Sequence, residues 1–578
     1  MTATPFWFGP EDRRLFGWLH EPDGPVRGGV VACCPVGYEH LLAYSTFAAL
    51  GEELARAGFV VLRFDYDGTG DSVGNDYESH RVNAWRDSTC RAIDLVRELT
   101  DQPISLVGMR LGATVAGAVA AGRDDIEAVV LWDPCISGRT FIRESKMLHI
   151  VGVGADEHPI DDGAFEAAGH VFTKDTVEQL SALSLTEIEG AIAPRVLALI
   201  RADRPFNSKA RAHIDATNDV TWEDAVGQSD LLDELSLLNN TTPFAAIARI
   251  ADWLADHFPP RAGSIVARVD HATTAVVDRV DGVDVIERPV RLGPLGLFGI
   301  ITEAEAETDE DRGPTIVCLN YGTAHHVGPS RMWVELARTW AARGLRVLRL
   351  DLSGIGDSPV RPGQQPQLAY QPEAFDDLVE VLEDLNASDP HDAVLVGVCS
   401  GAYVSIDVAA VHGVRGICVI NANLRFEPSD LLDSTGGTTR ALPPSRGLIR
   451  RVSASGLGEV ARDRMPPLAW HLLDRLHIHP APTHALERIV GEGTDTWLGF
   501  GTDNLLTMLT RRSKYALRGL GRKPNFHLEI VEGMDHLLML RRHRQQLAEV
   551  LTAHLVSRFG SREAASASLS QPSPGGRR

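Results

Sequence analysis

The chain has 578 residues, of which 44% are hydrophobic, so it can bury large cores and is not a mainly disordered protein. Its formal net charge of −22 argues against a protein that wraps nucleic acid or lies on an anionic membrane, because both need a basic surface. No stretch has the about 20 apolar residues of a membrane span, no secretory pattern opens the chain, and the seven cysteines form no CxxC motif, so we expect a cytoplasmic protein with reduced thiols.

A repeat of long period organises the chain. Residues 61–72 read VLRFDYDGTGDS and residues 347–358 read VLRLDLSGIGDS, an offset of 286 between residues 61 and 347. A second pair, LVGMRLGA over 106–113 and LVGVCSGA over 395–402, has an offset of 289. The period is far too long for a solenoid, so the repeat indicates two copies of one domain.

The joint between the copies falls where a helical pattern gives way to Pro259 and Pro260. We therefore predict a first domain over 1–262, a second over 263–559 and, because residues 560–578 are rich in Ser, Ala, Gly and Pro, a disordered tail.

Each copy alternates short apolar runs with helical patterns. In the second copy we expect strands over 315–319, 347–350, 393–396, 416–420, 497–500 and 525–531, and further strands between 270 and 298. Apolar strands that alternate with helices predict an α/β fold: a mostly parallel sheet flanked by helices, in each of two tandem domains. Segments 135–190 and 422–490 interrupt the alternation and are expected to be caps over the carboxyl ends of the sheets.

The glycine-rich turns of the repeat do not indicate a nucleotide site. Residues 68–74 lack GxGxxG spacing, and no GxxxxGK[ST] motif occurs in the chain. Potential metal ligands are not clustered in the sequence either. We therefore expect no cofactor and no metal.

The second copy contains a G-x-nucleophile-x-G turn from Gly397 to Gly401, between a strand and a helix. Such a turn exposes its central side chain above the sheet and aims the next N–H at a developing oxyanion. At this turn the chain resembles the α/β-hydrolase superfamily, and in particular tandem bacterial members related to exosortase-associated hydrolases. The resemblance implies that Cys399 is the nucleophile and Ser400 a backbone donor of the oxyanion hole; the alternative for Cys399 is a small buried core residue.

The same resemblance implies the rest of a triad. The superfamily places its base after the final strand, where His536 follows the strand over 525–531. The acid follows the penultimate strand, which selects Asp503, with Asp495 as the rival and an ordinary Asx turn as the alternative. Asp535 is expected to be a turn or helix-start residue, and the alternative is a neighbour that tunes the imidazole.

The second oxyanion donor is expected from the loop after the first buried strand of the second copy, at Tyr321 and Gly322. The nearby His325 and His326 are expected to be loop residues rather than catalysts.

The first copy departs from this pattern. Arg110 occupies the nucleophile position, Pro35 lacks the oxyanion N–H, and no histidine follows the last strand. We therefore predict a pseudo-hydrolase domain. Arg110 is expected to form a buried ion pair with Asp133 or Asp71, and the alternative is an anion site for a substrate carboxylate or phosphate.

These patterns predict an acyl-transfer enzyme that forms an acyl-Cys intermediate from an acyl thioester or ester and passes the acyl group to an alcohol, an amine or water, plausibly in secondary metabolism. The alternative is a non-catalytic scaffold of two degenerate domains. A cationic rim on the second copy could dock an acyl carrier protein or coenzyme A, although a solvated helix face explains it equally well. Its residues are Arg446, Arg450, Arg451, Arg462, Arg464, Arg511, Arg512, Lys514, Arg518, Arg522 and Lys523.

Overall fold

The computed structural model describes residues 2–153, 163–204, 206–232, 240–260, 272–280, 282–305, 313–386, 389, 391–424, 482–502, 509 and 511–560. Most of the predicted second cap and the predicted tail after Gly560 lie outside these residues.

The first domain is built on an eight-stranded sheet with the order β1-β2-β4-β3-β5-β6-β9-β10. Only the β1–β2 and β2–β4 pairings are antiparallel. The strands are β1 (Thr2–Phe8), β2 (Leu15–Glu21), β3 (Gly28–Cys33), β4 (Phe59–Phe64), β5 (Ile104–Met109), β6 (Ile126–Trp132), β9 (Arg195–Ile200) and β10 (Val220–Asp224).

Helices cover both faces of this sheet because its central strands are apolar on both sides. The helices α2 (Arg81–Leu99) and α3 (Leu111–Ala120) pack on one face, and α1 (Tyr38–Arg56) and α8 (Phe244–His257) pack on the other. The cap consists of α4 (Gly138–Val153), the hairpin of β7 (Phe165–Ala167) and β8 (His170–Phe172), and α5 (Lys174–Ala182). The remaining helices are η1 (Glu11–Arg13), α6 (Ser208–Thr217) and α7 (Ser229–Leu232).

The second domain repeats the plan with a nine-stranded sheet of order β11-β12-β13-β15-β14-β16-β17-β18-β19. In this sheet order, the neighbouring strands β15-β14-β16-β17-β18-β19 pair in parallel. The strands are β11 (Ala275–Val280), β12 (Val283–Leu292), β13 (Leu297–Ala304), β14 (Thr315–Cys318), β15 (Val347–Leu350), β16 (Ala393–Val398), β17 (Gly416–Ile420), β18 (Asp495–Gly501) and β19 (Phe526–Val531).

On this sheet α9 (Met332–Ala341) and α19 (Arg541–Phe559) share one apolar cluster. The other face carries α10 (Ala374–Leu385), α11 (Ser400–His412), α16 (Pro482–Gly491) and α18 (Arg511–Leu520), and the short η2 (Pro329–Arg331) precedes α9. The predicted fold class, two tandem α/β domains with mostly parallel sheets, is confirmed. The strand before the predicted nucleophile continues to Val398, two residues beyond the expected end at Val396.

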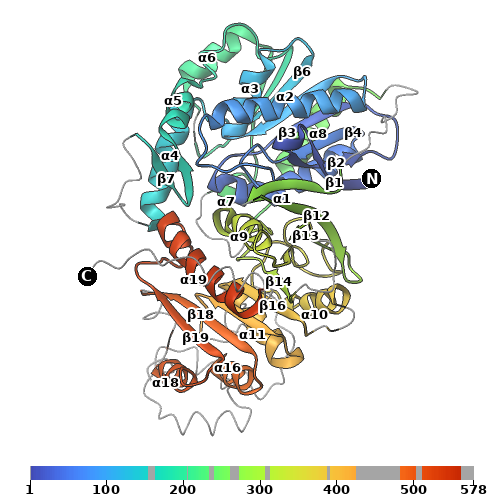
Figure 1. Cartoon of the computed structure of the whole chain (residues 1–578). Helices are drawn as coiled ribbons and strands as arrows, with labels where there is room; N and C mark the ends of the chain where they lie inside the picture. Colours follow the sequence, from blue (N-terminus) through green and yellow to red (C-terminus); the bar gives the residue numbers. More distant parts are fainter. Residues whose placement is uncertain are drawn as a thin grey trace, which may run out of the picture.

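The two domains lie one above the other, and α19 begins beside the cap of the first domain (Figure 1). They contact each other through corresponding residues of the repeat. Arg63 of the first domain pairs with Asp357 of the second, and Arg349 of the second pairs with Asp71 of the first. The offset of 286 relates Arg63 to Arg349 and Asp71 to Asp357. The same arginine–aspartate pair therefore forms twice across the interface, and each domain supplies the arginine once and the aspartate once, in an exchange of approximately two-fold symmetry.

His326 lies at the centre of this exchange, fully buried between two carboxylates. Its Nδ1 is 2.7 Å from Asp351 and its Nε2 is 2.7 Å from Asp71. Although burial disfavours the charged ring, these carboxylates raise the pKa of His326 to about 10, so both ring nitrogens donate hydrogen bonds at neutral pH. His325 stacks on Tyr44 of the first domain at 3.5 Å between ring centroids.

An apolar cluster adjoins the charged exchange and joins the first strands of the two sheets. Trp7 N–H donates to the carbonyl of Ala272 at 2.8 Å. The buried members of the cluster are Trp7, Phe16, Trp18, Ala275, Val277, Val285, Phe298, Ile300 and Ala341.

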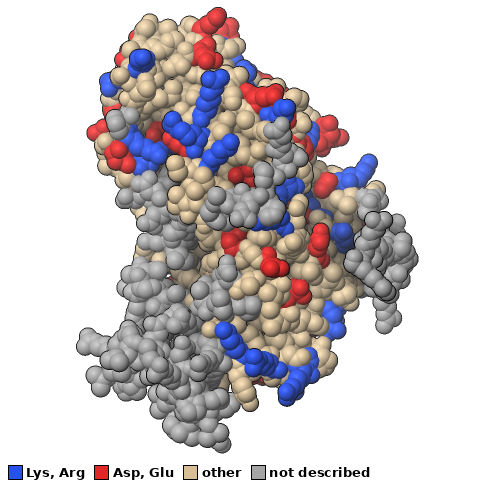
Figure 2. Space-filling view, turned by 90° about the vertical axis from the view of Figure 1, so that its left-hand side faces the viewer, with Lys and Arg blue, Asp and Glu red and all other residues tan. Residues whose placement is uncertain are grey.

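The face of the molecule in Figure 2 carries side chains of both charge signs, with lysines and arginines gathered on the first domain, in the upper part of the view.

Candidate active site

The turn between β16 and α11 has the backbone of a nucleophile elbow. Cys399 has φ 53° and ψ −107°, a conformation that L-residues rarely adopt and that costs of the order of 1–3 kcal/mol. Glycines are required on both sides. A Cβ on Gly397 would lie 2.3 Å from the backbone of Gly401, and a Cβ on Gly401 would lie 2.6 Å from the carbonyl of Asn320.

Two side chains contact the sulfur of Cys399. Its Sγ is 3.3 Å from Nε2 of His536 and 3.1 Å from the hydroxyl of Tyr370. The residue is 8% exposed. The structure therefore brings together the predicted nucleophile and the predicted base, and it adds Tyr370, which the sequence analysis missed. Tyr370 precedes α10 outside any motif, and its φ of 57° is visible only in the structure.

The environment keeps both groups neutral at rest. Burial raises the pKa of the Cys399 thiol above its usual 9.0, although the hydrogen bond with Tyr370 opposes this effect. Burial also lowers the pKa of His536 below 6.5, partly offset by the charge of Asp535. A neutral thiol therefore faces a neutral imidazole, which can accept the proton as the sulfur attacks.

Asn421 holds the loop that carries His536. It lies after β17 with φ 50°, and its Nδ2 donates to the carbonyls of Asp535 and His536 at 3.3 Å each. Its Oδ1 accepts the N–H of Gly501 at 3.1 Å, which ties the ends of β17 and β18 to the loop. Sequence analysis missed Asn421, although an offset of 288 places it opposite Asp133 of the first domain.

Asp535 has the role of a turn residue, because its carboxylate accepts the N–H groups of Met539 and Leu540 at 3.0 and 3.3 Å.

The acid of the predicted triad, Asp503, lies outside the described residues. Within the described chain, Nδ1 of His536 is buried and has no hydrogen-bond partner, so the imidazole offers a free donor or acceptor on the side away from the thiol. The rival acid, Asp495, is wrong. It is the first residue of β18 and pairs with Gly416 at the amino end of the parallel strands, whereas Cys399 lies at their carboxyl end.

The predicted oxyanion loop contacts the elbow. The N–H of Gly322 donates to the hydroxyl of Ser400 at 2.8 Å, so the side chain of Ser400 links the two segments. Tyr321 is 3% exposed, and in the described structure its hydroxyl has no hydrogen-bond partner. Burial, and to a lesser degree the nearby Cys399, raises the pKa of the Tyr321 phenol, so this group is a neutral donor next to the sulfur.

The cap of the first domain contacts the loop of His536. Arg544, at the start of α19, donates to the carbonyls of Leu538 and Met539 at 2.7 and 3.1 Å and also to the carbonyl of Gly169 in the β7–β8 turn. Glu166 of β7 accepts the N–H of Arg541 at 2.6 Å. The first domain therefore supports the base of the second.

The corresponding turn of the first domain keeps the strained backbone but carries a different side chain. Arg110 has φ 56° and ψ −124°, close to the values of Cys399. Its guanidinium contacts Glu39 at 2.9 Å, Asp133 at 3.4 Å and Glu144. Burial raises the pKa of Asp133 to about 6, and the arginine opposes that rise.

This arrangement favours the ion-pair interpretation of Arg110, because carboxylates already occupy its guanidinium. The alternative partner, Asp71, is wrong, since it contacts Arg349 and His326 at the domain interface.

Comparisons with known proteins agree with this architecture. Residues 316–550 match the model of the "Alpha/beta hydrolase family", and residues 27–154 match that of "Serine aminopeptidase, S33". No curated protein matches the chain in sequence.

Each of the similar solved structures covers a part of the chain about as long as one of its two domains. Est1E from Butyrivibrio proteoclasticus is 15% identical, with 44% of this chain and 98% of that chain covered and a TM-score of 0.31. The alpha/beta hydrolase GrgF from Penicillium sp. sh18 is 16% identical, with coverage of 45% and 99% and a TM-score of 0.32. Alpha/beta hydrolase domain-containing protein 10 from mouse is 15% identical, with coverage of 44% and 98% and a TM-score of 0.29. At these identities and scores the likenesses do not bear on activity.

The chain thus has two tandem domains of the α/β-hydrolase fold, and the two family matches support an enzyme of the hydrolase type. Among the helices of the described residues, none has the length and apolarity needed to cross a membrane.

Proposed function

We propose that the second domain is an acyl-transfer enzyme in which Cys399 forms an acyl-enzyme intermediate. The observation that carries the proposal is the thiol on a strained elbow with the Nε2 of His536 at 3.3 Å. A buried structural cysteine needs neither the positive φ nor the base. Within the superfamily, the tandem motifs support kinship with the exosortase-associated type.

The chemistry follows from the neutral pair. As Sγ of Cys399 attacks the carbonyl carbon of an acyl thioester or ester, the thiol proton moves to Nε2 of His536. The carbonyl π electrons become an oxyanion, for which the N–H of Ser400 and the hydroxyls of Tyr321 or Tyr370 are the nearby donors. When the carbonyl re-forms, the bond to the leaving thiolate or alkoxide breaks and His536 returns the proton to it. Asp503 is proposed to orient the imidazole from the side of Nδ1.

The acyl-Cys intermediate is then resolved by a second nucleophile. His536 removes a proton from water, an alcohol or an amine, the nucleophile attacks the acyl carbon, and the Cys399 thiol is released. A thiol nucleophile suits a thioester substrate because the exchange of one thioester for another is nearly balanced in free energy. The product is an acid, an ester or an amide according to the acceptor.

A small pocket lies beside the elbow, with a volume of about 10 Å³ that holds about one water molecule. Tyr370, Gly322 and Ser400 line it close to the nucleophile, and its remaining wall is largely apolar. The apolar lining residues are Leu352, Ile355, Leu368, Ala374 and Val404. The apolar wall favours the apolar part of an acyl group, which requires the lining side chains to move apart.

The carrier of the acyl group is proposed to be anionic, either an acyl carrier protein or coenzyme A. The described part of the cationic rim lies on α18 and the turn that follows it, where Lys514, Arg518, Arg522 and Lys523 are exposed. Exposed charges act mainly on the association rate and are screened by salt. The value of kcat/KM for a carrier-bound substrate should therefore fall with added salt, and Arg518→Glu should weaken that dependence.

An acyl-thioester probe followed by intact mass tests the proposal. The wild-type protein should gain the mass of one acyl group, and Cys399→Ala should gain none. Cys90→Ala is the matched control, since Cys90 is the one half-exposed thiol of the described residues, and it should label like wild type. Labelling that persists in Cys399→Ala, or no labelling of the wild type, would favour the non-catalytic scaffold.

The pH profile offers a second test. The base must be neutral to accept the proton, and burial lowers the pKa of His536 below 6.5. The acid limb of kcat/KM should therefore fall below pH 6.5. A limb clearly above pH 6.5 would mean that another group is the base.

A further inference from the structure

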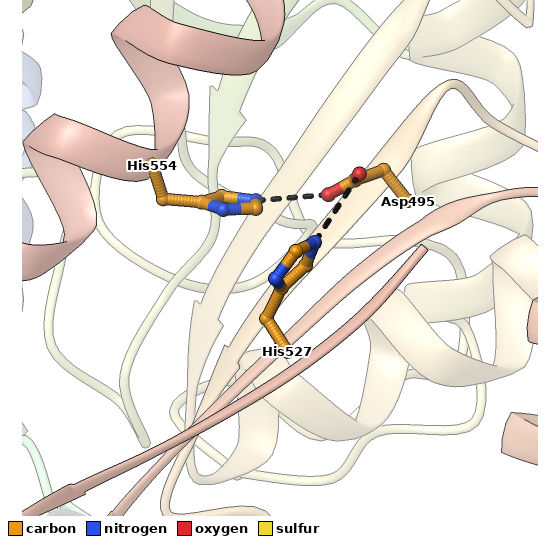
Figure 3. Close-up of side chains that lie close together, drawn as sticks. All are labelled: Asp495, His527 and His554. Atoms are coloured by element: carbon orange, nitrogen blue, oxygen red, sulfur yellow. Dashed lines mark ion pairs between the residues drawn. The ribbon is translucent and has the colours of Figure 1, made fainter. Parts of the chain in front are cut away.

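Three side chains from three elements meet near the amino ends of β18 and β19 (Figure 3). Asp495 begins β18, His527 is the second residue of β19, and His554 lies on α19. The Nε2 of His554 is 2.8 Å from Oδ1 of Asp495, and the Nε2 of His527 is 3.7 Å from Oδ2. One ligand atom from each residue lies within 4.8 Å of the other two.

The strand register dictates this convergence. Trp497 of β18 lies opposite His527 of β19 in a parallel pair. Because side chains alternate along a strand, Asp495 and Trp497 share one face of the sheet, and His527 lies beside them. Trp497 belongs to the same apolar cluster as Leu551 of α19. The helix thus packs on that face and brings His554 onto the pair.

The ligand atoms of the cluster are buried. Within the described structure, Oδ1 of Asp495 and the Nε2 atoms of His527 and His554 have no hydrogen-bond partner. The 2.8 Å approach of His554 to Asp495 is an ion-pair contact, so these two side chains are partners of each other. The side chains of Asp495 and His554 are only 7% and 8% exposed. The side chain of His527 is 36% exposed. Three polar side chains that converge on one point and contact one another there form a set of ligand atoms ready for an ion.

We propose that Asp495, His527 and His554 bind a divalent transition-metal ion, with Zn²⁺ as the ion that fits best. Two imidazole nitrogens and one carboxylate oxygen form a donor set that Zn²⁺ accepts, with water in the fourth position. Three separate elements supply the ligands, so the ion ties α19 to β18 and β19. The site lies at the amino end of the strands, far from the thiol chemistry, and its role is structural.

Arg558 is the internal competitor of the ion. Its Nε donates to Oδ2 of Asp495 at 2.6 Å, so Oδ1, which faces His554, is the oxygen available to the metal. Its positive charge opposes a second cation nearby and lowers the affinity of the site. The side chain of Arg558 is 44% exposed, so it can move outward when the ion binds.

Zinc binding to the full-length, tag-free protein tests the proposal. After equilibrium dialysis against ZnSO₄, the wild type should retain one tightly bound ion per chain that the His527→Ala/His554→Ala double variant does not retain. Loss of a ligand should cost more than the about 10- to 100-fold in affinity that follows loss of a group which only orients a ligand. His257→Ala, which removes an exposed histidine on α8, should bind like wild type. Equal retention by wild type and double variant, or none by either, overturns the proposal.

Arg558→Gln separates the metal site from a simple ion-pair cluster and does not remove a ligand. A metal site predicts tighter zinc binding than in wild type and a zinc-dependent rise in the unfolding midpoint, because an ion that binds only the folded state stabilises it. A cluster held by the arginine alone predicts a lower midpoint that zinc does not raise. That second result would overturn the proposal even if the double variant failed to fold.

Discussion

The two elbows of this chain share one backbone and differ in what they hold. At Cys399 the strained turn presents a neutral thiol to an imidazole, and at Arg110 it presents a guanidinium to carboxylates. The strain therefore survives the loss of the nucleophile. A positive φ at an elbow is thus evidence of descent and architecture, and only the side chain and its neighbours are evidence of chemistry.

The largest expected effect follows replacement of the base, because only the elbow at Cys399 depends on it for activity. His536→Ala removes the proton acceptor of Cys399, so we expect kcat/KM for an acyl thioester to fall about 10³-fold or more. The unfolding midpoint should stay close to that of wild type. His412→Ala, an exposed histidine at the end of α11, is the control for loss of an imidazole. Turnover retained in His536→Ala would mean that another residue is the base.

At the first elbow the expected effect is on stability. Arg110→Met leaves Glu39, Asp133 and Glu144 without their common counter-charge, which should lower the free energy of unfolding by about 3–5 kcal/mol. Chemical denaturation measures the change. Arg143→Met, an exposed arginine on α4, should change little. If Arg110→Met were as stable as wild type but altered substrate binding, the anion-site interpretation would replace the ion pair.

A change in the first domain should also reach the active site of the second. A Cβ on Gly169 would lie 2.0 Å from Ser330 and 2.7 Å from the guanidinium of Arg544, which holds the His536 loop. We expect Gly169→Ala to lower kcat about 10-fold by displacing the base, because catalysis is sensitive to shifts below 1 Å. Gly163→Ala is matched to it, since Gly163 also has a positive φ in the cap but meets only Lys174. Equal kcat in both variants would mean that the cap does not support the base.

A pH dependence of the domain interface is also expected. His326 titrates near 6.5 when unfolded and at about 10 when folded, so its contribution to stability is complete below pH 6.5 and is lost as the pH rises toward 10. The unfolding midpoint of wild type should decline over that interval more steeply than that of His326→Gln. Parallel declines in the two proteins would show that the ring is neutral in the folded state.

Sequence alone predicted the elements that local pattern defines. The alternation of strands and helices, the elbow at Cys399 and the position of His536 after the last strand all follow from short motifs whose geometry the chain itself sets. The first sheet, the second sheet and the contact between Cys399 and His536 agree with those expectations.

What sequence could not supply depends on packing between distant segments. Asp71 was a candidate partner of Arg110. In the structure the second domain packs against Asp71, whose carboxylate contacts Arg349 and His326. Asp495 was the rival candidate for the acid, yet β18 begins at this residue, which places it at the amino end of the parallel strands and not at the end that carries Cys399. The histidines beside it come from separate elements, so no ligand spacing could reveal them.

The exchange of Arg63 and Arg349 between the halves bears on how the chain is made. The N-terminal half leaves the ribosome first and can complete its own sheet, but its Arg63 then lacks Asp357 and its Trp18 lacks the cover of Phe298. Until residue 357 has been translated, that half carries an uncompensated charge and an open aromatic surface, the features that chaperones recognise and that favour aggregation. Because the two halves belong to one polypeptide, the second half is translated directly after the first and is present at a high effective concentration. The time during which this surface of the first half is exposed is therefore shorter.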